Sequence, residues 1–370
     1  MGDRYLKEQI LEDLEDKMVF LTGPRQVGKT TLSRNLFSEC QYLNWDISKD
    51  REIILKEEWR PGFNNIIFDE IHKFPSWRNY LKGVYDEFKD TKKILVTGSG
   101  RLDFYRRGGD SLQGRYHFLR LHPFSVNELK LQSSNDLEDM MKLGLFPEPF
   151  LKGSEKKANR WSKEYRFRFL NEDIRDLESI SDIGKLEILS SQFGNHVGSL
   201  FSSNSARENI QVAHATIEKW VAALERLFYV FRIYPFYSDL YRSLRKEPKL
   251  YLFHLLEIKS EAARFENLVA LHLLKFVDYR NDAFGEDWKL QYLRDRDGRE
   301  TDFAIIEDGE VKTLVECKLE ESDIDKSLKY FKEKFPKAKA WQIHLRGKKN
   351  YESTNGIRVA PAIEFLKQFV

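Results

Sequence analysis

The feature that most constrains this chain is the segment Gly23 to Thr30, which fits the pattern G-x-x-x-x-G-K-[ST] without a mismatch. An apolar run before it, Met18 to Thr22, reads as a strand, and Thr30 to Phe37 reads as a helix. Glycines let such a loop curl so that backbone N–H groups face phosphate oxygens. Lys29 can then reach the β- and γ-phosphates, and the Thr30 hydroxyl can ligate Mg²⁺. The residues expected to bind nucleotide are Gly23, Pro24, Arg25, Gln26, Val27, Gly28, Lys29, Thr30 and Thr31.

A second apolar run, Ile66 to Phe68, ends in two adjacent acids, Asp69 and Glu70. Beside a phosphate loop, Asp69 would hold Mg²⁺ and Glu70 would orient or deprotonate the attacking water. Two acids after an apolar run are also typical of a helix N-terminus, so that alternative stays open for the pair taken alone. Together the two motifs predict a hydrolase that uses ATP and Mg²⁺.

The next apolar run, Ile94 to Val96, is followed by Thr97-Gly98-Ser99. Ser99 is the candidate for sensing the γ-phosphate or the water, Thr97 is the second candidate, and an ordinary polar loop is the alternative. Arg115 is the candidate for the positive charge that phosphoryl transfer needs late in the reaction, supplied in cis or by a neighbouring subunit. A surface or nucleic-acid contact is the alternative role for Arg115.

The order of elements predicts an α/β protein of several domains, since 370 residues exceed one comfortable core. Strand, helix (Trp77 to Phe88) and strand alternate in residues 1–132, which is typical of a doubly wound P-loop domain. Residues 133–248 read as a helical and winged-helix region, with a helix from Ala215 to Leu227 leading into a strand. The apolar face of that helix is expected to be core: Ile217, Trp220, Val221 and Leu224.

Residues 249–370 are expected to form a compact α/β domain. The pattern predicts a helix at 261–276, strands at 289–293, 301–306 and 313–318, a helix at 324–334, a strand at 338–344 and a closing helix at 362–369. Asp297-Gly298 and Asp308-Gly309 are hairpin signals between the three strands.

Several motifs together resemble one prokaryotic group, the AAA-superfamily ATPases of archaea and bacteria that carry an uncharacterised C-terminal domain. The motifs are Leu21-Thr22-Gly23-Pro24-Arg25-Gln26-Val27-Gly28-Lys29-Thr30-Thr31, Phe68-Asp69-Glu70-Ile71-His72-Lys73, Thr97-Gly98-Ser99, Gly114-Arg115 and Leu121-His122-Pro123-Phe124-Ser125. The resemblance implies an AAA-type ATPase fold. Members commonly have an aspartate soon after a Pro-Lys-x-Tyr run, whereas here Pro248-Lys249-Leu250-Tyr251 leads to His254.

Asp302 and the run Glu316-Cys317-Lys318 resemble the metal site of restriction-endonuclease-like nucleases. That chemistry needs two carboxylates on Mg²⁺ and a lysine near the attacking water. Strand alternation puts Glu316 and Lys318 on one face, and Glu266 lies on the preceding helix, where such folds often add an acid. The alternative is a degenerate domain that keeps the fold for contacts only.

Composition limits the remaining function classes. The charge is nearly balanced at +2, from 61 basic and 59 acidic residues, so there is no global attraction to nucleic acid. The absence of a bilayer-length apolar run and of a disulfide framework around Cys40 and Cys317 predicts a soluble, cytoplasmic chain with no membrane partner. We expect an ATPase that acts with or on DNA and has further copies of itself as partners in a homo-oligomer. The alternative is a nucleotide-switched regulatory ATPase with an inactive C-terminal domain.

Overall fold

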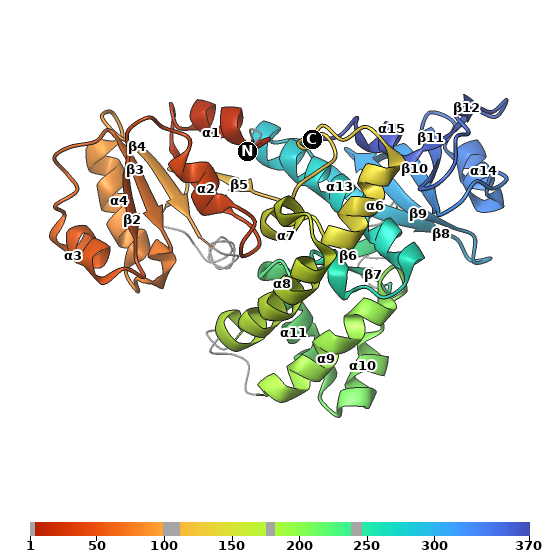
Figure 1. Ribbon diagram of the computed structural model, residues 1–370, viewed down its shortest axis with the longest axis horizontal. Coiled ribbons are helices and arrows are strands. Elements are labelled where there is room, and N and C mark those ends of the chain that lie inside the picture. The colour runs from red at the N-terminus through yellow and green to blue at the C-terminus, as the bar shows by residue number, and fades with distance from the viewer. Residues whose placement is uncertain (1–3, 99–111, 175–181, 238–245) are drawn as a thin grey trace. The chain divides into compact units, whose positions relative to one another are not determined.

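The computed structural model describes residues 4–98, 112–174, 182–237 and 246–370 (Figure 1). The chain divides into two compact units. The first runs to Pro123 and includes Arg226–Phe228, and the second comprises Phe124–Glu225 and Tyr229–Val370. Each unit is built around its own β-sheet. The middle and C-terminal regions, which the sequence separates at residues 248 and 249, therefore belong to one compact unit.

The sheet of the first unit has five parallel strands in the order β2-β3-β4-β1-β5. The strands are β1 (Met18–Thr22), β2 (Gln41–Asn44), β3 (Asn65–Asp69), β4 (Lys93–Thr97) and β5 (Tyr116–Arg120). Every residue of β1 is buried, as expected when both faces of a parallel sheet are covered. The sequence predicted β1, β3 and β4, and it missed β2 and β5.

The helices of this unit are α1 (Lys7–Asp13), α2 (Lys29–Arg34), α3 (Ser48–Lys56), the 3-10 helix Ile71–Lys73 and α4 (Trp77–Phe88). The predicted bounds of α4 are confirmed. Its buried face carries Trp77, Leu81 and Val84, which share one core cluster with Phe20 and Phe68 of the strands. Spacing of three and four residues puts those three side chains on the same side of the helix.

The second unit contains an eight-stranded sheet in the order β12-β13-β11-β10-β9-β8-β6-β7. Its strands are β6 (Val230–Pro235), β7 (Lys249–Leu252), β8 (Trp288–Arg294), β9 (Glu300–Glu307), β10 (Glu310–Lys318), β11 (Lys339–His344), β12 (Tyr351–Glu352) and β13 (Ile357–Pro361). β6 is antiparallel to β7 and parallel to β8. The expected boundary before Lys249 thus lies inside a continuous sheet, because it separates two paired strands.

The remaining helices are α6 (Ser134–Leu143), α7 (Pro147–Lys152), α8 (Glu155–Arg168), the π-helix Phe169–Asp173, α9 (Ile183–His196), α10 (Ser203–Ile210), α11 (His214–Arg226), the 3-10 helix Leu255–Glu257, α13 (Glu261–Phe284), α14 (Lys326–Lys334) and α15 (Ala362–Leu366). The predicted apolar face of α11 is confirmed as core, since all four of its residues are buried. α13 runs past its predicted end and stops only where Gly285 takes a left-handed conformation, with φ of 68°.

Candidate functional site

Two glycines give the loop between β1 and α2 its shape. Gly23 has φ of 149°, and a side chain there would collide with the backbone carbonyl of Leu121. Gly28 has φ of 100°, a conformation that L-residues rarely adopt, immediately before α2 begins. The two invariant positions of the motif therefore coincide with the two places where only glycine fits.

Lys29 is folded back over this loop. Its side chain is buried, and Nζ donates hydrogen bonds to the carbonyl oxygens of Gly23 at 2.9 Å and Pro24 at 2.7 Å. The ammonium group is thus held at the loop by backbone oxygens, in reach of any phosphate that the loop binds.

Asp69 is the centre of a hydrogen-bond network at the carboxyl ends of the strands. Its carboxylate is buried and accepts from Thr30 Oγ1 at 3.2 Å on Oδ2 and from Thr97 Oγ1 at 2.5 Å on Oδ1. The Tyr42 hydroxyl also donates to Oδ2. Because β1 to β4 are parallel, their polar ends meet at the same edge of the sheet, where ligands of such sheets bind.

Tyr42 is a site residue that the sequence did not reveal. It lies on β2, and Arg34 of α2 stacks on its ring at 3.9 Å from the ring centroid. Burial, together with the hydrogen bond to Asp69, raises the pKa of Tyr42 to about 12, so the hydroxyl remains a donor. Thr97, the second candidate for the sensor, contacts Asp69, and Ser99, the first candidate, lies outside the described residues.

Glu70 adopts a left-handed backbone conformation, with φ of 56°. Its N–H donates to Thr97 O at 2.9 Å, and its carboxylate lies 3.2 Å from Lys73 Nζ and 3.7 Å from His72 Nε2. A 3-10 helix does begin at Ile71, but the Glu70 side chain makes no capping hydrogen bond to it. Glu70 thus directly precedes a helix, as the helix-start alternative expects, while its carboxylate contacts Lys73 and His72. For a residue other than glycine, such a conformation costs on the order of 1–3 kcal/mol and is typical of functional sites.

Arg115 lies at the start of β5, where its carbonyl accepts from Met18 N at the start of β1. The phosphate loop follows the other end of β1, and five residues at about 3.3 Å each put roughly 16 Å between the two. The guanidinium donates to both carboxylate oxygens of Asp86, at 2.7 and 3.2 Å, and this hydrogen bonding raises the pKa of Arg115. Arg115 thus lies at the amino ends of the strands, whereas the phosphate loop of its own domain lies at their carboxyl ends.

In the second unit, the carboxylates expected to bind metal converge on a lysine. Asp302 of β9 and Glu266 of α13 lie 3.8 and 3.7 Å from Lys249 Nζ, and Glu300 lies 2.7 Å from it. Lys249 is buried. No group of three or more His, Cys, Asp or Glu side chains in the described ranges has an arrangement that could hold a metal ion.

Burial and mutual charge strongly shift the pKa values of the residues in this cluster. Burial, with repulsion from Asp302, raises the pKa of Glu266 to about 7 and that of Glu316 to about 8. Burial alone would lower the pKa of Lys249, but the charges of Asp302, Glu266 and Glu300 outweigh it and raise that pKa. The lysine is therefore a permanently charged counter-ion for these carboxylates.

Lys318 is engaged next to this cluster. Its Nζ donates to Glu316 Oε1 at 2.8 Å and to Asp325 Oδ2 at 3.1 Å. Asp302 accepts from the backbone N–H of Cys317 at 2.8 Å. The four residues that the sequence suggested thus come together, and the sequence did not reveal that Lys249, Glu300 and Asp325 join them.

His254, which follows the run Pro248-Lys249-Leu250-Tyr251, is packed among aromatic rings. The ring centroids of Phe146, Trp161 and Tyr165 lie 5.2 to 5.9 Å from its own. Its Nε2 is hydrogen-bonded to Ser162 Oγ at 2.7 Å, and burial lowers the pKa of His254 to about 3. The neutral imidazole is thus part of the core and carries no charge that a ligand could read.

Three family profiles match successive parts of the chain. Residues 15–130 match an "AAA domain", residues 134–254 a "Domain of unknown function (DUF8612)" and residues 261–365 a "Domain of unknown function (DUF4143)". The chain therefore carries an AAA-type P-loop ATPase domain followed by two uncharacterised domains. Within the described residues, no helix has the length and apolar character needed to cross a membrane.

Among curated proteins, the chain is similar to "Uncharacterized protein Rv2008c" of Mycobacterium tuberculosis, with 24% identity over 64% of this chain and 54% of the relative. It is also similar to "Uncharacterized protein MJ1637" of Methanocaldococcus jannaschii, with 23% identity over 66% of this chain and 63% of the relative. The chain thus spans somewhat more than half the length of the curated relatives that it matches.

Two solved structures show a faint likeness. Unliganded Pif1 from Bacteroides sp. has 15% identity and a TM-score of 0.23, with 41% of this chain and 48% of that chain covered. A STAND protein with a tetratricopeptide repeat sensor from Pyrococcus horikoshii has 13% identity and a TM-score of 0.24, with 75% and 51% covered. Neither likeness is close enough to inform the function.

Proposed function

We propose that the AAA domain of this chain is a Mg²⁺-dependent ATPase. The observation that carries the proposal is the contact between Thr30 Oγ1 and Asp69 Oδ2, at 3.2 Å, beside the loop that holds Lys29. A hydroxyl and a carboxylate at the end of a phosphate loop are the ligand types that Mg²⁺ takes at such sites.

Each residue then has a defined role. The loop backbone and Lys29 bind the β- and γ-phosphates, and Thr30 with Asp69 would hold Mg²⁺. The metal, when bound, neutralises charge that develops on the phosphates. Thr97 and Tyr42 hold the Asp69 carboxylate by hydrogen bonds. Glu70 orients the attacking water or accepts its proton.

The test is phosphate release from ATP by the full chain, with and without Mg²⁺. Lys29→Ala should reduce turnover by orders of magnitude, because Lys29 supplies the charge at the transferring phosphate. Lys49→Ala removes an exposed lysine from α3 of the same unit and should leave turnover unchanged. Unaltered turnover in a folded Lys29→Ala chain would refute the assignment.

The second part of the proposal is that the protein acts with or on DNA through its winged-helix and nuclease-like regions. The support is that Asp302, Glu316 and Lys318 gather in one buried cluster with Glu266. Carboxylates are suitable ligands for Mg²⁺, but the Lys249 ammonium already lies beside Glu266, Glu300 and Asp302 and offsets part of their charge. A divalent cation would have to compete with the Lys249 ammonium, so the fit to a metal is incomplete and we derive no cleavage step from it.

That competition is measurable by Mn²⁺ titration calorimetry of the full chain, in an Asp69→Asn background that removes the metal ligand of the ATP site. In this background, the chain with Lys249→Met should bind Mn²⁺ more tightly than the chain that keeps Lys249. Lys249→Arg retains the positive charge, so it should not bind Mn²⁺ more tightly. Circular dichroism checks that each variant is folded. No Mn²⁺ binding in any variant, together with no cleavage of linear, supercoiled or branched DNA, would eliminate the nuclease function.

The alternative function is a nucleotide-switched regulatory ATPase whose C-terminal domain is inactive. The Lys249 ion pairs favour it, because the lysine occupies the position beside Glu266, Glu300 and Asp302 and offsets part of their charge without a metal. This function predicts ATP hydrolysis without any DNA cleavage, and a partner whose binding differs between the ATP-bound and ADP-bound chain.

A further inference from the structure

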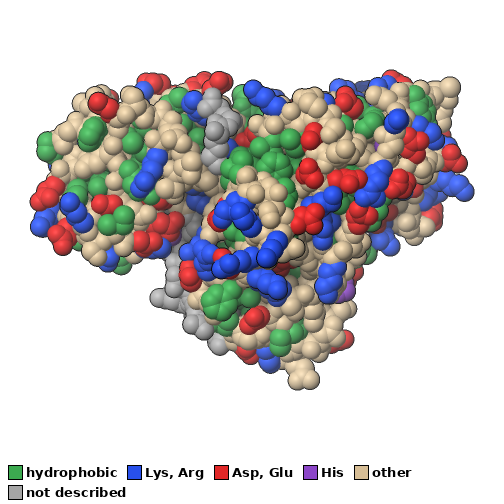
Figure 2. All heavy atoms as spheres, viewed as in Figure 1, with side chains coloured by type: hydrophobic (Ala, Val, Ile, Leu, Met, Phe, Trp, Pro, Cys, Tyr) green, Lys and Arg blue, Asp and Glu red, His purple; other side chains and the backbone are tan. Residues whose placement is uncertain are grey.

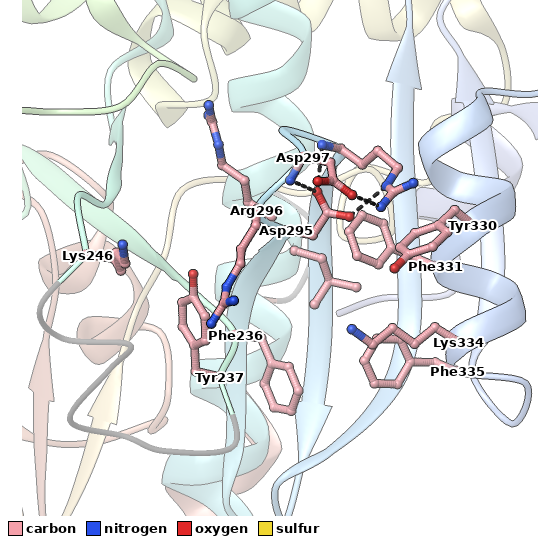
Figure 3. Close-up of a pocket in the computed structure, with 13 residues that line it drawn as sticks. Phe236, Tyr237, Lys246, Asp295, Arg296, Asp297, Tyr330, Phe331, Lys334 and Phe335 are labelled. Carbon is pink, nitrogen blue, oxygen red and sulfur yellow. Dashed lines mark hydrogen bonds and ion pairs between the residues drawn. The ribbon is translucent and has the colours of Figure 1, made fainter.

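A pocket of about 810 Å³ opens on the second unit, between the end of β6, the β8–β9 hairpin and α14 (Figure 3). Phe236 and Tyr237 line one side of it, and Tyr330, Lys334 and Phe335 line the other. The volume is within the range of about 300–1,000 Å³ that is usual for ligand pockets. Neither the ATP site nor the Lys249 cluster contributes a lining residue.

The pocket is rich in positive charge. Among the described residues, five cations and two carboxylates line it. Two of the cations are compensated: Arg294 pairs with Glu300 at 3.0 Å, and Arg299 pairs with Asp295 and Asp297. The other three, Lys246, Arg296 and Lys334, are exposed and make no hydrogen bond or ion pair with the described part of the chain.

This charge is local and does not belong to a generally basic surface. The whole chain has a net charge of only +2. On the face drawn in Figure 2, basic and acidic side chains are interspersed. Three uncompensated cations around one concavity therefore make a specific site for an anion with several negative charges.

Aromatic rings are the second feature of the pocket, beside its positive charge. Phe236 and Phe335 meet edge to face, with ring centroids 6.2 Å apart, and the Arg299 guanidinium lies 3.9 Å from the centroid of Tyr330. These three rings are half-buried and pack against a core cluster beneath the sheet, which fixes their positions. Tyr237, next to Phe236, is also half-buried and keeps part of its ring accessible.

We propose that this pocket binds single-stranded nucleic acid. Bases would stack on the accessible rings, Tyr237 foremost, while Lys246, Arg296 and Lys334 contact phosphates. Accessible rings beside exposed cations are the combination that binds unpaired strands, because every base offers a π-face and every nucleotide a phosphate. A double helix has its base faces covered, and the carboxylates of an acidic peptide are much smaller than a base and stack weakly, so neither ligand uses both the rings and the cations fully.

The inference rests on the DNA-directed part of the proposed function, but it requires neither ATP hydrolysis nor a metal at the Lys249 cluster. The experiment is fluorescence anisotropy with the full chain and a fluorescein-labelled oligothymidylate, in chelator and without nucleotide. Oligouridylate and a duplex of equal length are the further probes. Affinity is measured over a series of salt concentrations, since the salt dependence counts phosphate contacts.

Two kinds of variant separate stacking from charge. Arg296→Gln and Lys334→Gln should each make the negative slope of log K against log salt shallower by roughly 0.7, the value for one phosphate contact on a single strand. Tyr237→Ala should weaken binding by roughly 5- to 100-fold and leave the slope unchanged, because it removes a stacking ring and no charge.

The matched control is Lys259→Gln, which removes an exposed lysine of the same unit that does not line the pocket. It should bind the oligonucleotides like the wild type. The proposal is overturned if no single strand binds, if duplex binds as tightly as oligothymidylate, or if polyglutamate displaces the oligonucleotide equally well. It is also overturned if Lys219→Gln, on helix α11 of the proposed winged-helix region, weakens binding while the pocket variants do not, since that helix would then be the interface. Circular dichroism and urea unfolding of the pocket variants check that the second unit is folded, because ATP hydrolysis reports on the first unit.

Discussion

Thr30 Oγ1 lies 3.2 Å from Asp69 Oδ2 although 39 positions separate the two residues in the sequence. The parallel order of β1, β4 and β3 brings them together, and Thr97 holds the other oxygen of the same carboxylate at 2.5 Å. The carboxylate is therefore oriented by neighbouring side chains independently of any bound ligand. Such preorganisation lowers the cost of assembling a catalytic site.

Glu70→Gln should bind ATP with unchanged affinity and hydrolyse it about 100- to 10,000-fold more slowly, the range for loss of a general base. Binding depends on Lys29 and the loop, whereas water activation needs the carboxylate. Phosphate release and equilibrium binding of a fluorescent ATP analogue measure the two effects. Glu39→Gln, at an exposed acid of the same unit, is the control. Lost affinity with normal turnover would make Glu70 a structural residue.

Tyr42→Phe should raise the Mg²⁺ concentration needed for half-maximal ATPase activity by roughly 10-fold or more, as expected when a group that orients a metal ligand is removed. The hydroxyl donates to Asp69, and the ring remains in place. Tyr80→Phe is the matched control, because it removes a hydroxyl that bonds Trp59 instead. A Mg²⁺ titration that is the same in both variants would exclude an orienting role for Tyr42.

Arg115→Ala tests whether a second copy completes the ATP site. Arg115 lies at the end of the strands opposite to the phosphate loop of its own domain. Its removal should therefore abolish hydrolysis only if it serves a neighbouring copy. Mixing equal amounts of Arg115→Ala and Glu70→Gln chains should then restore about a quarter of the wild-type rate, since random head-to-tail pairing gives that share of intact sites. Absence of rescue, or full activity in a strictly monomeric protein, would rule out the trans role.

His272 should destabilise the second unit as the pH falls from about 6.5 toward 4, with a sign opposite to that of Glu266 and Glu316, whose pKa values are raised. His272 donates from Nδ1 to Leu268 O at 2.8 Å and accepts from Val126 N–H at 3.0 Å, so its ring is neutral. Burial, and to a lesser extent the charge of Lys275 (which is paired with Glu128), lowers the pKa of His272 from 6.5 to about 4. The unfolded chain therefore binds more protons in this range, and protonation favours unfolding.

Urea unfolding at pH 7.5 and pH 5 measures this effect. His272→Gln keeps a hydrogen-bonding side chain but removes the titrating group, so the difference between its two unfolding midpoints should be smaller than in the wild type. An equal difference in both proteins would mean that other groups govern the acid sensitivity of this unit.

Local patterns predicted the parts of the fold that depend on neighbouring residues. The phosphate loop, β1 and α4 were correctly placed because their glycines and apolar spacing are visible within a dozen residues. β2 was missed because only Leu43 of its four residues is buried, so it has no apolar run. Tyr42 was missed with it, since a tyrosine on an unrecognised strand has no visible link to Asp69.

The C-terminal cluster around Lys249 shows a different limit of prediction from sequence. The predicted hairpin placed Asp302 and Glu316 on adjacent strands, and β9 and β10 are paired. Lys249 reaches Asp302 from β7, which is distant in sequence and pairs with β6 at the end of the sheet. No periodicity within one segment can reveal a counter-ion that arrives from another.

The place of Arg115 at the amino ends of the strands has a consequence for assembly. If Arg115 of one copy serves the phosphate loop of another, each active site takes residues from two copies. A two-fold dimer would complete two such sites in one self-complementary interface, whereas a head-to-tail contact would generate closed rings or open filaments. In either arrangement an isolated copy lacks the arginine at its own site, so the rate of hydrolysis per chain would rise with protein concentration.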